Sequence, residues 1–120
     1  MTETDYTKKF RKELMAGLSS LVLLSVLARA DRDMYGYEIA KALKAEGETG
    51  PLFKQGAIYP VLRSLEASGL LSSRVEMQAL GPPRRYYAIT SEGKNALAEW
   101  SGAWRDMRNF VDDALKGEVL

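Results

Sequence analysis

The spacing of apolar residues changes twice along this chain of 120 residues, and this change constrains the fold more than any other feature. Up to about residue 70, apolar residues recur every three or four positions, as on the buried face of a helix. Between residues 71 and 90 they alternate with polar residues, and after residue 91 they follow a heptad. The sequence therefore predicts helices, then two strands, then one long helix, in a chain of single-domain length.

Glycine, proline and capping residues place the ends of these elements. Pro60 lacks a backbone N–H, which argues against a helix that starts far upstream of Gln55. Gly47 and Gly69 are natural helix stops, and Thr90 or Ser91 can cap the last helix. The expected elements are helices over residues 10–28, 35–46 and 55–68, strands over 71–78 and 84–90, and a final helix from about 91 to 116.

The composition excludes several kinds of chemistry. The chain has neither cysteine nor histidine, which rules out disulfide scaffolds, thiolate catalysis, zinc fingers and acid–base catalysis by histidine. Its carboxylate pairs, such as Asp112 and Asp113, lie at expected helix ends or solvated faces, and no glycine-rich phosphate loop follows a strand. We therefore expect no enzyme activity, no metal and no cofactor.

The first apolar run imitates a secretory signal in outline. Basic residues precede the run Leu18–Ala28, which ends in the small-residue pattern Ala28-Arg29-Ala30. Serines interrupt this run, acidic residues precede it, and it is shorter than the roughly 20 apolar residues that a membrane span needs. A buried helix is the better interpretation, so we expect a cytoplasmic protein with no membrane partner.

The expected order of elements is that of a winged helix-turn-helix. Three helices followed by a two-stranded β-wing make a mainly α-helical (α+β) fold, in which the third helix enters the major groove of DNA. Residues 1–90 are then the DNA-binding domain and residues 91–120 a C-terminal dimerisation helix. Two alternatives remain open, another small α+β fold of the same order and a winged-helix module that binds protein instead of DNA. An exposed apolar patch on the third helix would favour the protein-binding module.

Three local sequences carry a family resemblance: YGYEIAKAL (35–43), GAIYPVLRSLEASGLL (56–71) and PRRYYAITSEGKNAL (83–97). Together they resemble the PadR family of bacterial transcriptional regulators over about residues 14–115, and the single C-terminal helix resembles the shorter members. The resemblance implies a homodimeric repressor that binds a palindromic operator in double-stranded DNA. It also implies that the C-terminal helix pairs with its mate and with the partner's first helix, and some members release DNA when a small aromatic effector binds.

The DNA-binding candidates lie on the third helix and on the wing. Tyr59 and Arg63 are four residues apart on the helix face turned from the core, where they can contact phosphates or bases. Arg84 and Arg85 follow a proline-stiffened wing tip and point to opposite faces of their strand. Other roles remain open, since Tyr59 can pack at the helix–helix turn, Arg63 can pair with Glu66, and the wing arginines can be solvated charges. Weaker candidates are Tyr37, Lys41, Lys54 and Gln55.

The heptad of the last helix predicts a dimer interface. Its seam consists of Leu97, Trp100, Trp104, Met107, Val111 and Ala114. Part of it can pack on the chain's own first helix instead, because heptad spacing also serves intramolecular bundles.

An aromatic effector site is expected on the same seam. Trp100 and Trp104 are neighbours on one helix face, and a flat ligand can stack between them and their mates across a two-fold axis. The resemblance favours Trp104, since drug-sensing members of the family carry a tryptophan at the matching position. Expected walls are Leu14, Met15 and Leu18, and the other interpretation is that both tryptophans belong to the core.

Overall fold

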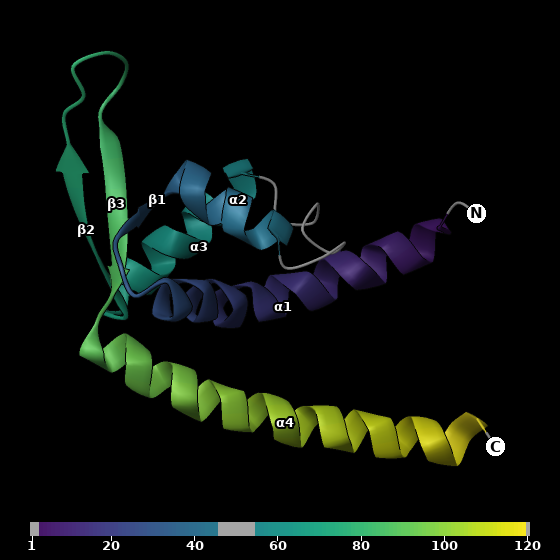
Figure 1. Ribbon diagram of the computed structural model, residues 1–120. Helices are drawn as coiled ribbons and strands as arrows, with labels where there is room; N and C mark the ends of the chain where they lie inside the picture. Colours follow the sequence, from purple (N-terminus) through teal and green to yellow (C-terminus); the bar gives the residue numbers. More distant parts are fainter. Residues whose placement is uncertain (1–2, 46–54, 120) are drawn as a thin grey trace.

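The described residues form seven elements, and six of them follow the order that the sequence predicts (Figure 1). The seventh is a short additional strand, β1. The computed structural model describes residues 3–45 and 55–119, so Lys54 lies outside the described residues, as does the side chain of Gln55. The mainly helical fold with a β-wing is thereby confirmed. The elements are α1 (Asp5–Ala30), β1 (Met34–Tyr35), α2 (Gly36–Ala45), α3 (Gln55–Ala67), β2 (Leu71–Glu76), β3 (Arg84–Ile89) and α4 (Ser91–Val119).

The sheet has three antiparallel strands in the order β1-β3-β2, where the sequence predicted two. Strands β2 and β3, with the residues between them, form the wing (residues 71–89), and Glu76 opposite Arg84 is its outermost pair. The added strand β1 pairs Met34 with Tyr87 and Tyr35 with Tyr86. Two residues are too few to show an alternating pattern, which is why the sequence did not reveal this strand. It ties the base of the wing to the start of α2.

The core lies where α1, α2, α3 and the base of the sheet meet. Alternation along β3 turns Tyr87 inward, and α3 buries one stripe of side chains at helical spacing. The buried core residues are Leu23, Leu24, Val26, Leu27, Met34, Ile39, Leu43, Ile58, Leu62, Leu65, Leu71 and Tyr87.

Helix α1 is longer than the apolar run suggested. It begins at Asp5 instead of Phe10, and the side chain of Thr4 caps it by accepting a hydrogen bond from the backbone N–H of Thr7. The expectation that this segment is too short for a membrane span does not hold for the whole helix. By length and composition alone, α1 could cross a membrane, a test that the core helix of a soluble protein also passes. Four of its residues, Leu23 to Leu27 without Ser25, belong to the core.

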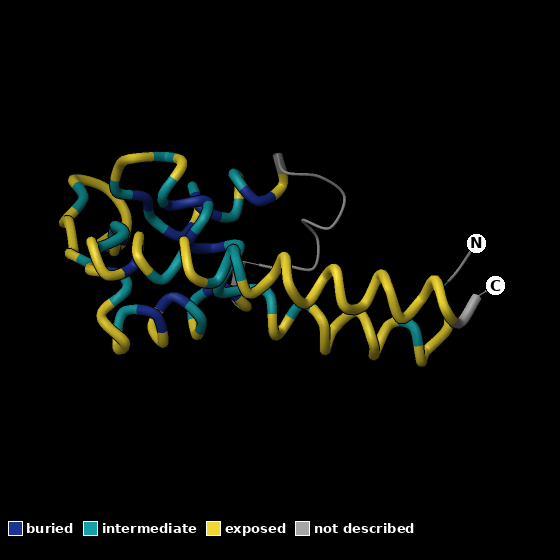
Figure 2. Tube along the Cα trace, turned by 90° about the horizontal axis from the view of Figure 1, so that it is seen from below, coloured by how far each residue is buried: buried dark blue, intermediate teal, exposed yellow. Residues whose placement is uncertain are grey.

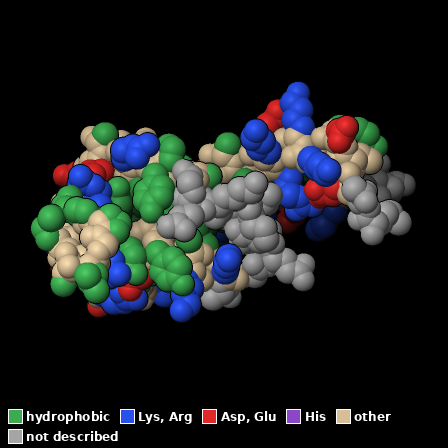
Figure 3. All heavy atoms as spheres, turned by 90° about the horizontal axis from the view of Figure 1, so that it is seen from above, with side chains coloured by type: hydrophobic (Ala, Val, Ile, Leu, Met, Phe, Trp, Pro, Cys, Tyr) green, Lys and Arg blue, Asp and Glu red, His purple; other side chains and the backbone are tan. Residues whose placement is uncertain are grey.

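The first half of α1 and the second half of α4 project from this core. Figure 2 shows both projecting halves exposed, whereas the buried residues gather at the other end of the molecule. The molecule measures 61 × 36 × 22 Å, and the projecting helices account for its long axis (Figure 1). The basic residues at positions 8, 9, 11 and 12 lie on α1 within this projection, where Figure 3 shows Lys and Arg side chains on the surface.

Helix α3 contains Pro60 as its sixth residue, in its second turn. Its ring nitrogen cannot donate, so the helix lacks one hydrogen bond to the carbonyl four residues earlier. The predicted start at Gln55 is confirmed.

One residue, Thr90, joins the end of α3 to the start of α4. Its hydroxyl donates to the carbonyl of Gly69 at 2.7 Å and accepts from the backbone N–H of Gly93 at 3.0 Å. Its own N–H donates to the carbonyl of Leu70 at 3.1 Å. A Cβ atom at Gly93 would lie 2.1 Å from that carbonyl oxygen, so only glycine permits this close approach. We call this contact the α3–α4 junction.

Candidate nucleic-acid interface

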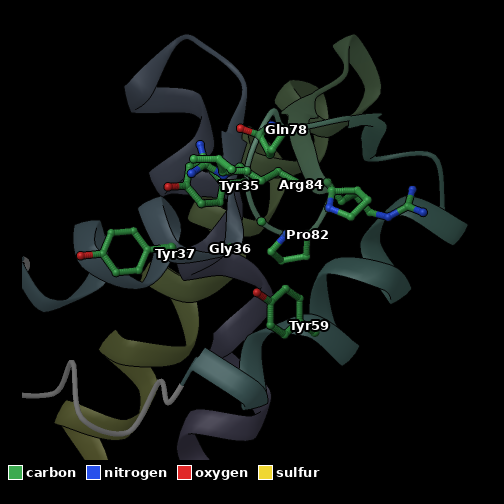
Figure 4. A pocket seen from close by; sticks show the side chains of 11 residues that line it. Tyr35, Gly36, Tyr37, Tyr59, Gln78, Pro82 and Arg84 are labelled. Carbon is green, nitrogen blue, oxygen red and sulfur yellow. The ribbon is translucent and has the colours of Figure 1, made fainter.

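A hollow of about 540 Å³ lies between the wing and the first residues of α2 and α3 (Figure 4). We call it the wing groove. Aromatic rings and two arginines dominate its lining, a combination that suits a polyanion with flat bases. The lining residues are Tyr35, Gly36, Tyr37, Tyr59, Gln78, Leu80, Gly81, Pro82, Pro83, Arg84 and Arg85.

The floor of the wing groove is a close contact between α2 and α3. The hydroxyl oxygen of Tyr59 lies where a Cβ atom at Gly36 would come within 2.2 Å. Glycine at the first position of α2 therefore allows the ring of Tyr59 to lie against the helix start. Tyr59 is half-buried, so it does pack at the helix–helix contact as one interpretation of the sequence held, and it also lines the groove.

Beside the groove, the described part of α3 presents an exposed face without large hydrophobic side chains. Ile58, Leu62 and Leu65 point into the core, and Arg63 is exposed on the other side of the helix. The carboxylate of Glu66 accepts a hydrogen bond from the Ser73 hydroxyl at 2.6 Å. Glu66 is thus engaged with the wing.

The two wing arginines point to opposite faces of the sheet, as the alternation predicted. Arg85 donates from Nη1 to the hydroxyl of Ser73 at 2.9 Å, which links it through that hydroxyl to Glu66 on α3. Arg84 lies on the outer face, with its guanidinium carbon 4.5 Å from the centroid of the Tyr35 ring. The pKa of Arg84 is raised above its ordinary value, chiefly by a hydrogen bond to the side chain of Tyr86, so the cation is permanent.

A third wing arginine, Arg74, is neutralised by its neighbours. It forms ion pairs with Asp33, at 3.0 Å, and with Glu76. These hydrogen bonds raise its pKa further, with Glu76 contributing most. Behind the wing, burial raises the pKa of the Tyr87 hydroxyl, which stays protonated in the core.

The structure gathers four of the sequence-predicted residues, Tyr37, Tyr59, Arg84 and Arg85, around the wing groove. Arg63 lies on the adjoining face of α3 but does not line the hollow. Tyr35 and Gln78 line it and were not singled out from the sequence. Tyr35 stands directly before Gly36, in the motif that carried the family resemblance. This position is the one sequence signal that could have marked Tyr35 as a site residue.

A second hollow, of about 320 Å³, lies between α1 and α4, and we call it the seam groove. Both Trp100 and Trp104 line it, together with Leu18 from α1. The expected walls Leu14 and Met15 do not line it in this chain. Their places are taken by Gly17, Ser20 and Leu21, with Ala103 and Met107 from α4.

The seam of α4 divides into an inner and an outer part. Leu97 and Trp100 pack against the core of their own chain, as the intramolecular alternative held. Trp104 is 38% exposed, Met107 66% and Val111 50%, and Ala114 is exposed as well.

Within residues 3–45 and 55–119, no group of three or more Asp or Glu side chains could hold a metal ion.

Fold and site together define a winged helix-turn-helix protein, with a recognition helix, a basic wing and a long C-terminal helix. Residues 23–99 match the model of the transcriptional regulator PadR-like family, and the chain belongs to this family. Its members are transcriptional regulators rather than enzymes.

Solved structures of PadR regulators agree with this assignment. A PadR family regulator from Eggerthella lenta is 30% identical, with a TM-score of 0.75 over 92% of this chain and 93% of that one. PadR of Bacillus subtilis, solved in complex with operator DNA, is 27% identical, with a TM-score of 0.57 over 69% of this chain and 46% of that one. An uncharacterised protein of Lysinibacillus sphaericus is 29% identical over 89% of this chain and 96% of its own length.

Proposed function

We propose that this protein is a cytoplasmic repressor that binds a palindromic operator in double-stranded DNA through α3 and the wing. The observation that supports the proposal is the wing groove, which Tyr37, Tyr59, Arg84 and Arg85 line, together with the exposed Arg63 on α3. Tyrosine hydroxyls and arginine guanidinium groups are donors that suit a phosphate backbone, and an exposed arginine on α3 can read guanine. The similarity to an operator-bound PadR from Bacillus subtilis supports the same partner.

The character of α3 favours DNA over a protein partner. Within the described part of α3, no large hydrophobic side chain is exposed, and the outward residues are Ala57, Pro60, Arg63, Ser64 and Ala67. A surface that docks on protein would present apolar anchors at its centre. The protein-binding alternative therefore has no observation in its favour on this helix.

We further propose that the protein works as a homodimer through the projecting helices, residues 91–120 being the dimerisation helix. Large apolar side chains on these helices are exposed in the single chain, and water-exposed patches of this kind mark interfaces. They are Tyr6, Phe10 and Leu14 of α1 and Trp104, Met107, Phe110, Val111 and Leu115 of α4. A second copy of the chain supplies matching faces, as a two-fold interface requires.

The seam groove supports a small aromatic effector that releases the DNA. Its lining is mostly apolar and includes two indole rings, of which Trp104 is partly open to solvent. Such a ligand acts only if it binds one geometry of the dimer better than another. No cofactor is part of this proposal.

Selection from a random pool of duplex DNA tests the proposal directly. The purified protein should enrich sequences with two inverted half-sites, their centres about 10 bp or a multiple of that apart. Binding of the enriched duplex should exceed that of the same duplex with both half-sites scrambled by at least about a thousandfold. Failure to enrich any sequence, or equal affinity for both duplexes, would refute the proposal.

A further inference from the structure

We propose that Tyr35 is a positioning residue, whose ring holds the Arg84 guanidinium in the orientation in which it meets the DNA backbone. This role rests on the DNA binding proposed above. Tyr35 belongs to β1, the short strand that joins the wing to the start of α2. Figure 4 shows Tyr35 and Arg84 together at one side of the wing groove.

The contact between the two side chains leaves the donors of Arg84 available. The guanidinium lies over the ring, with 4.5 Å between its carbon and the ring centroid. The N–H donors of an arginine lie in the plane of the guanidinium, so a ring over one face does not occupy them. The side chain of Tyr86 is the first cause of the raised pKa of Arg84, which keeps the group charged. The donors can bind a phosphate at a smaller entropy cost, because the long side chain is already ordered.

The ring of Tyr35 is itself held from several sides. Backbone pairing places Tyr35 opposite Tyr86, and the two ring centroids are 5.3 Å apart. The backbone N–H of Tyr35 donates to Oε1 of Glu38 at 3.2 Å, as in the reciprocal half of a capping box. The ring of Tyr37 also stacks with that of Tyr35, at 6.2 Å between centroids. The platform therefore exists before any DNA arrives.

Arg74, on the same face of the sheet, shows how an arginine held by carboxylates differs from Arg84, which is held by an aromatic ring. Arg74 lies 4.7 Å from the centroid of the Tyr86 ring, but two carboxylates, Asp33 and Glu76, also hold it. Carboxylates fix an arginine and cancel its charge, whereas a ring fixes it and leaves the charge. Among the residues that the structure describes, Arg84 forms no ion pair with a carboxylate. The outer face of the wing thus keeps one oriented cation that no carboxylate pairs directly, although Glu38 acts on its charge at longer range.

A double-mutant cycle separates positioning from direct contact. The proteins are the wild type, Tyr35→Leu, Arg84→Ala, the double variant, and Tyr35→Phe as the matched control that keeps the ring. Their affinities for the duplex enriched by selection are measured by fluorescence anisotropy at one salt concentration. Tyr35→Leu should weaken binding by about three- to tenfold, and Tyr35→Phe by less than about twofold. In the Arg84→Ala background, Tyr35→Leu should weaken binding no further, because the group it positions is gone.

Several results would overturn the proposal. Equal weakening by Tyr35→Leu in both backgrounds would mean that Tyr35 contacts DNA itself or only supports the fold. Unchanged affinity of Tyr35→Leu would remove the role altogether. Thermal unfolding of all five proteins identifies a purely structural effect. Such an effect would make Tyr35→Leu lower the melting temperature equally in the wild-type and Arg84→Ala backgrounds, and the DNA affinity would fall in parallel.

The failure of DNA binding is distinguishable from the failure of positioning. If the wild type binds neither the enriched pool nor the scrambled duplex, the proposed function is wrong and this role falls with it. If the wild type binds, the NMR signal of the Arg84 Nε–H group reports the stack without DNA. Ring currents should shift this signal in the wild type and in Tyr35→Phe, and the shift should vanish in Tyr35→Leu. A shift that survives in Tyr35→Leu would refute the stack.

Discussion

Adjacent arginines of the wing meet different neighbours, and the difference follows from strand alternation. Arg84 lies over an aromatic ring on the outer face of the sheet, whereas Arg85 reaches Ser73 on the side of α3. Arg63 differs from both, because it is exposed on the recognition helix and Glu66, its possible partner, bonds to Ser73. Each of the three arginines can therefore be tested by itself.

Arg63→Ala should weaken operator binding by about 1–3 kcal/mol if the side chain reads a base, and by less if it touches only phosphate. The side chain is exposed and does not belong to the core, so the variant should fold like the wild type. Gel shifts at fixed salt measure the effect. Lys9→Ala, which removes a charge from the far end of α1, serves as control and should bind normally. Equal affinities of the wild type and Arg63→Ala would take Arg63 out of the interface.

Individual residues were predictable where a local motif carried them. Tyr37, Tyr59, Arg84 and Arg85 came from short sequences, and all four line the wing groove. Tyr35 was overlooked because its partner, Arg84, is 49 positions away along the chain. Such a pairing depends on the register of β1 against β3, which local patterns do not contain.

Elements were predictable in proportion to their length. Helices α2 and α3 and the strands of the wing follow a clear period, and their observed bounds lie close to the expected ones. Strand β1 is too short to have a period. The start of α1 was placed too late because charged residues surround Phe10, although Tyr6, Phe10 and Leu14 continue the spacing of four.

As an element, the wing should contribute to the salt dependence of DNA binding. Replacing both Arg84 and Arg85 with Ala should reduce the slope of log affinity against log salt by about one unit for each phosphate that the wing no longer neutralises. Affinities over a series of salt concentrations give the slope. Lys9→Ala combined with Lys12→Ala removes the same charge from α1 and should leave the slope close to that of the wild type. A wing variant with the wild-type slope would show that the wing does not touch the backbone.

At the scale of the whole molecule, the projecting helices should bring two chains together. Met107→Lys places a charge on the exposed part of the seam and should shift the sedimentation of the protein from dimer towards monomer or aggregate. Val111→Lys should act in the same way. Asn109→Lys adds the same charge away from the seam and should leave the dimer intact. A stable dimer from both seam variants would contradict this assembly.

The effector prediction also belongs to this scale, because the site depends on how α4 meets α1. Planar aromatic compounds such as flavins, phenolic acids and dyes should quench the tryptophan fluorescence of the wild type at micromolar concentrations. Trp104→Ala should abolish this binding, and Trp100, which lines the same groove, remains as the reporter. If no compound binds, or if the variant binds equally well, Trp104 belongs to the packing of the seam alone.

The α3–α4 junction has a mechanical consequence. Helix α4 has 29 residues, so it is a rigid arm about 43 Å long that starts one residue after Thr90. If α4 rotates by one degree about the junction, its far end moves by about 0.75 Å. If α4 is held in place instead, α3 turns by that one degree. The hydrogen bonds of Thr90 and the close approach at Gly93 hold the end of α3 tightly against the start of α4. A small displacement of the far end of α4 is therefore coupled to the angle between α4 and α3, the helix through which we propose that the protein reads DNA.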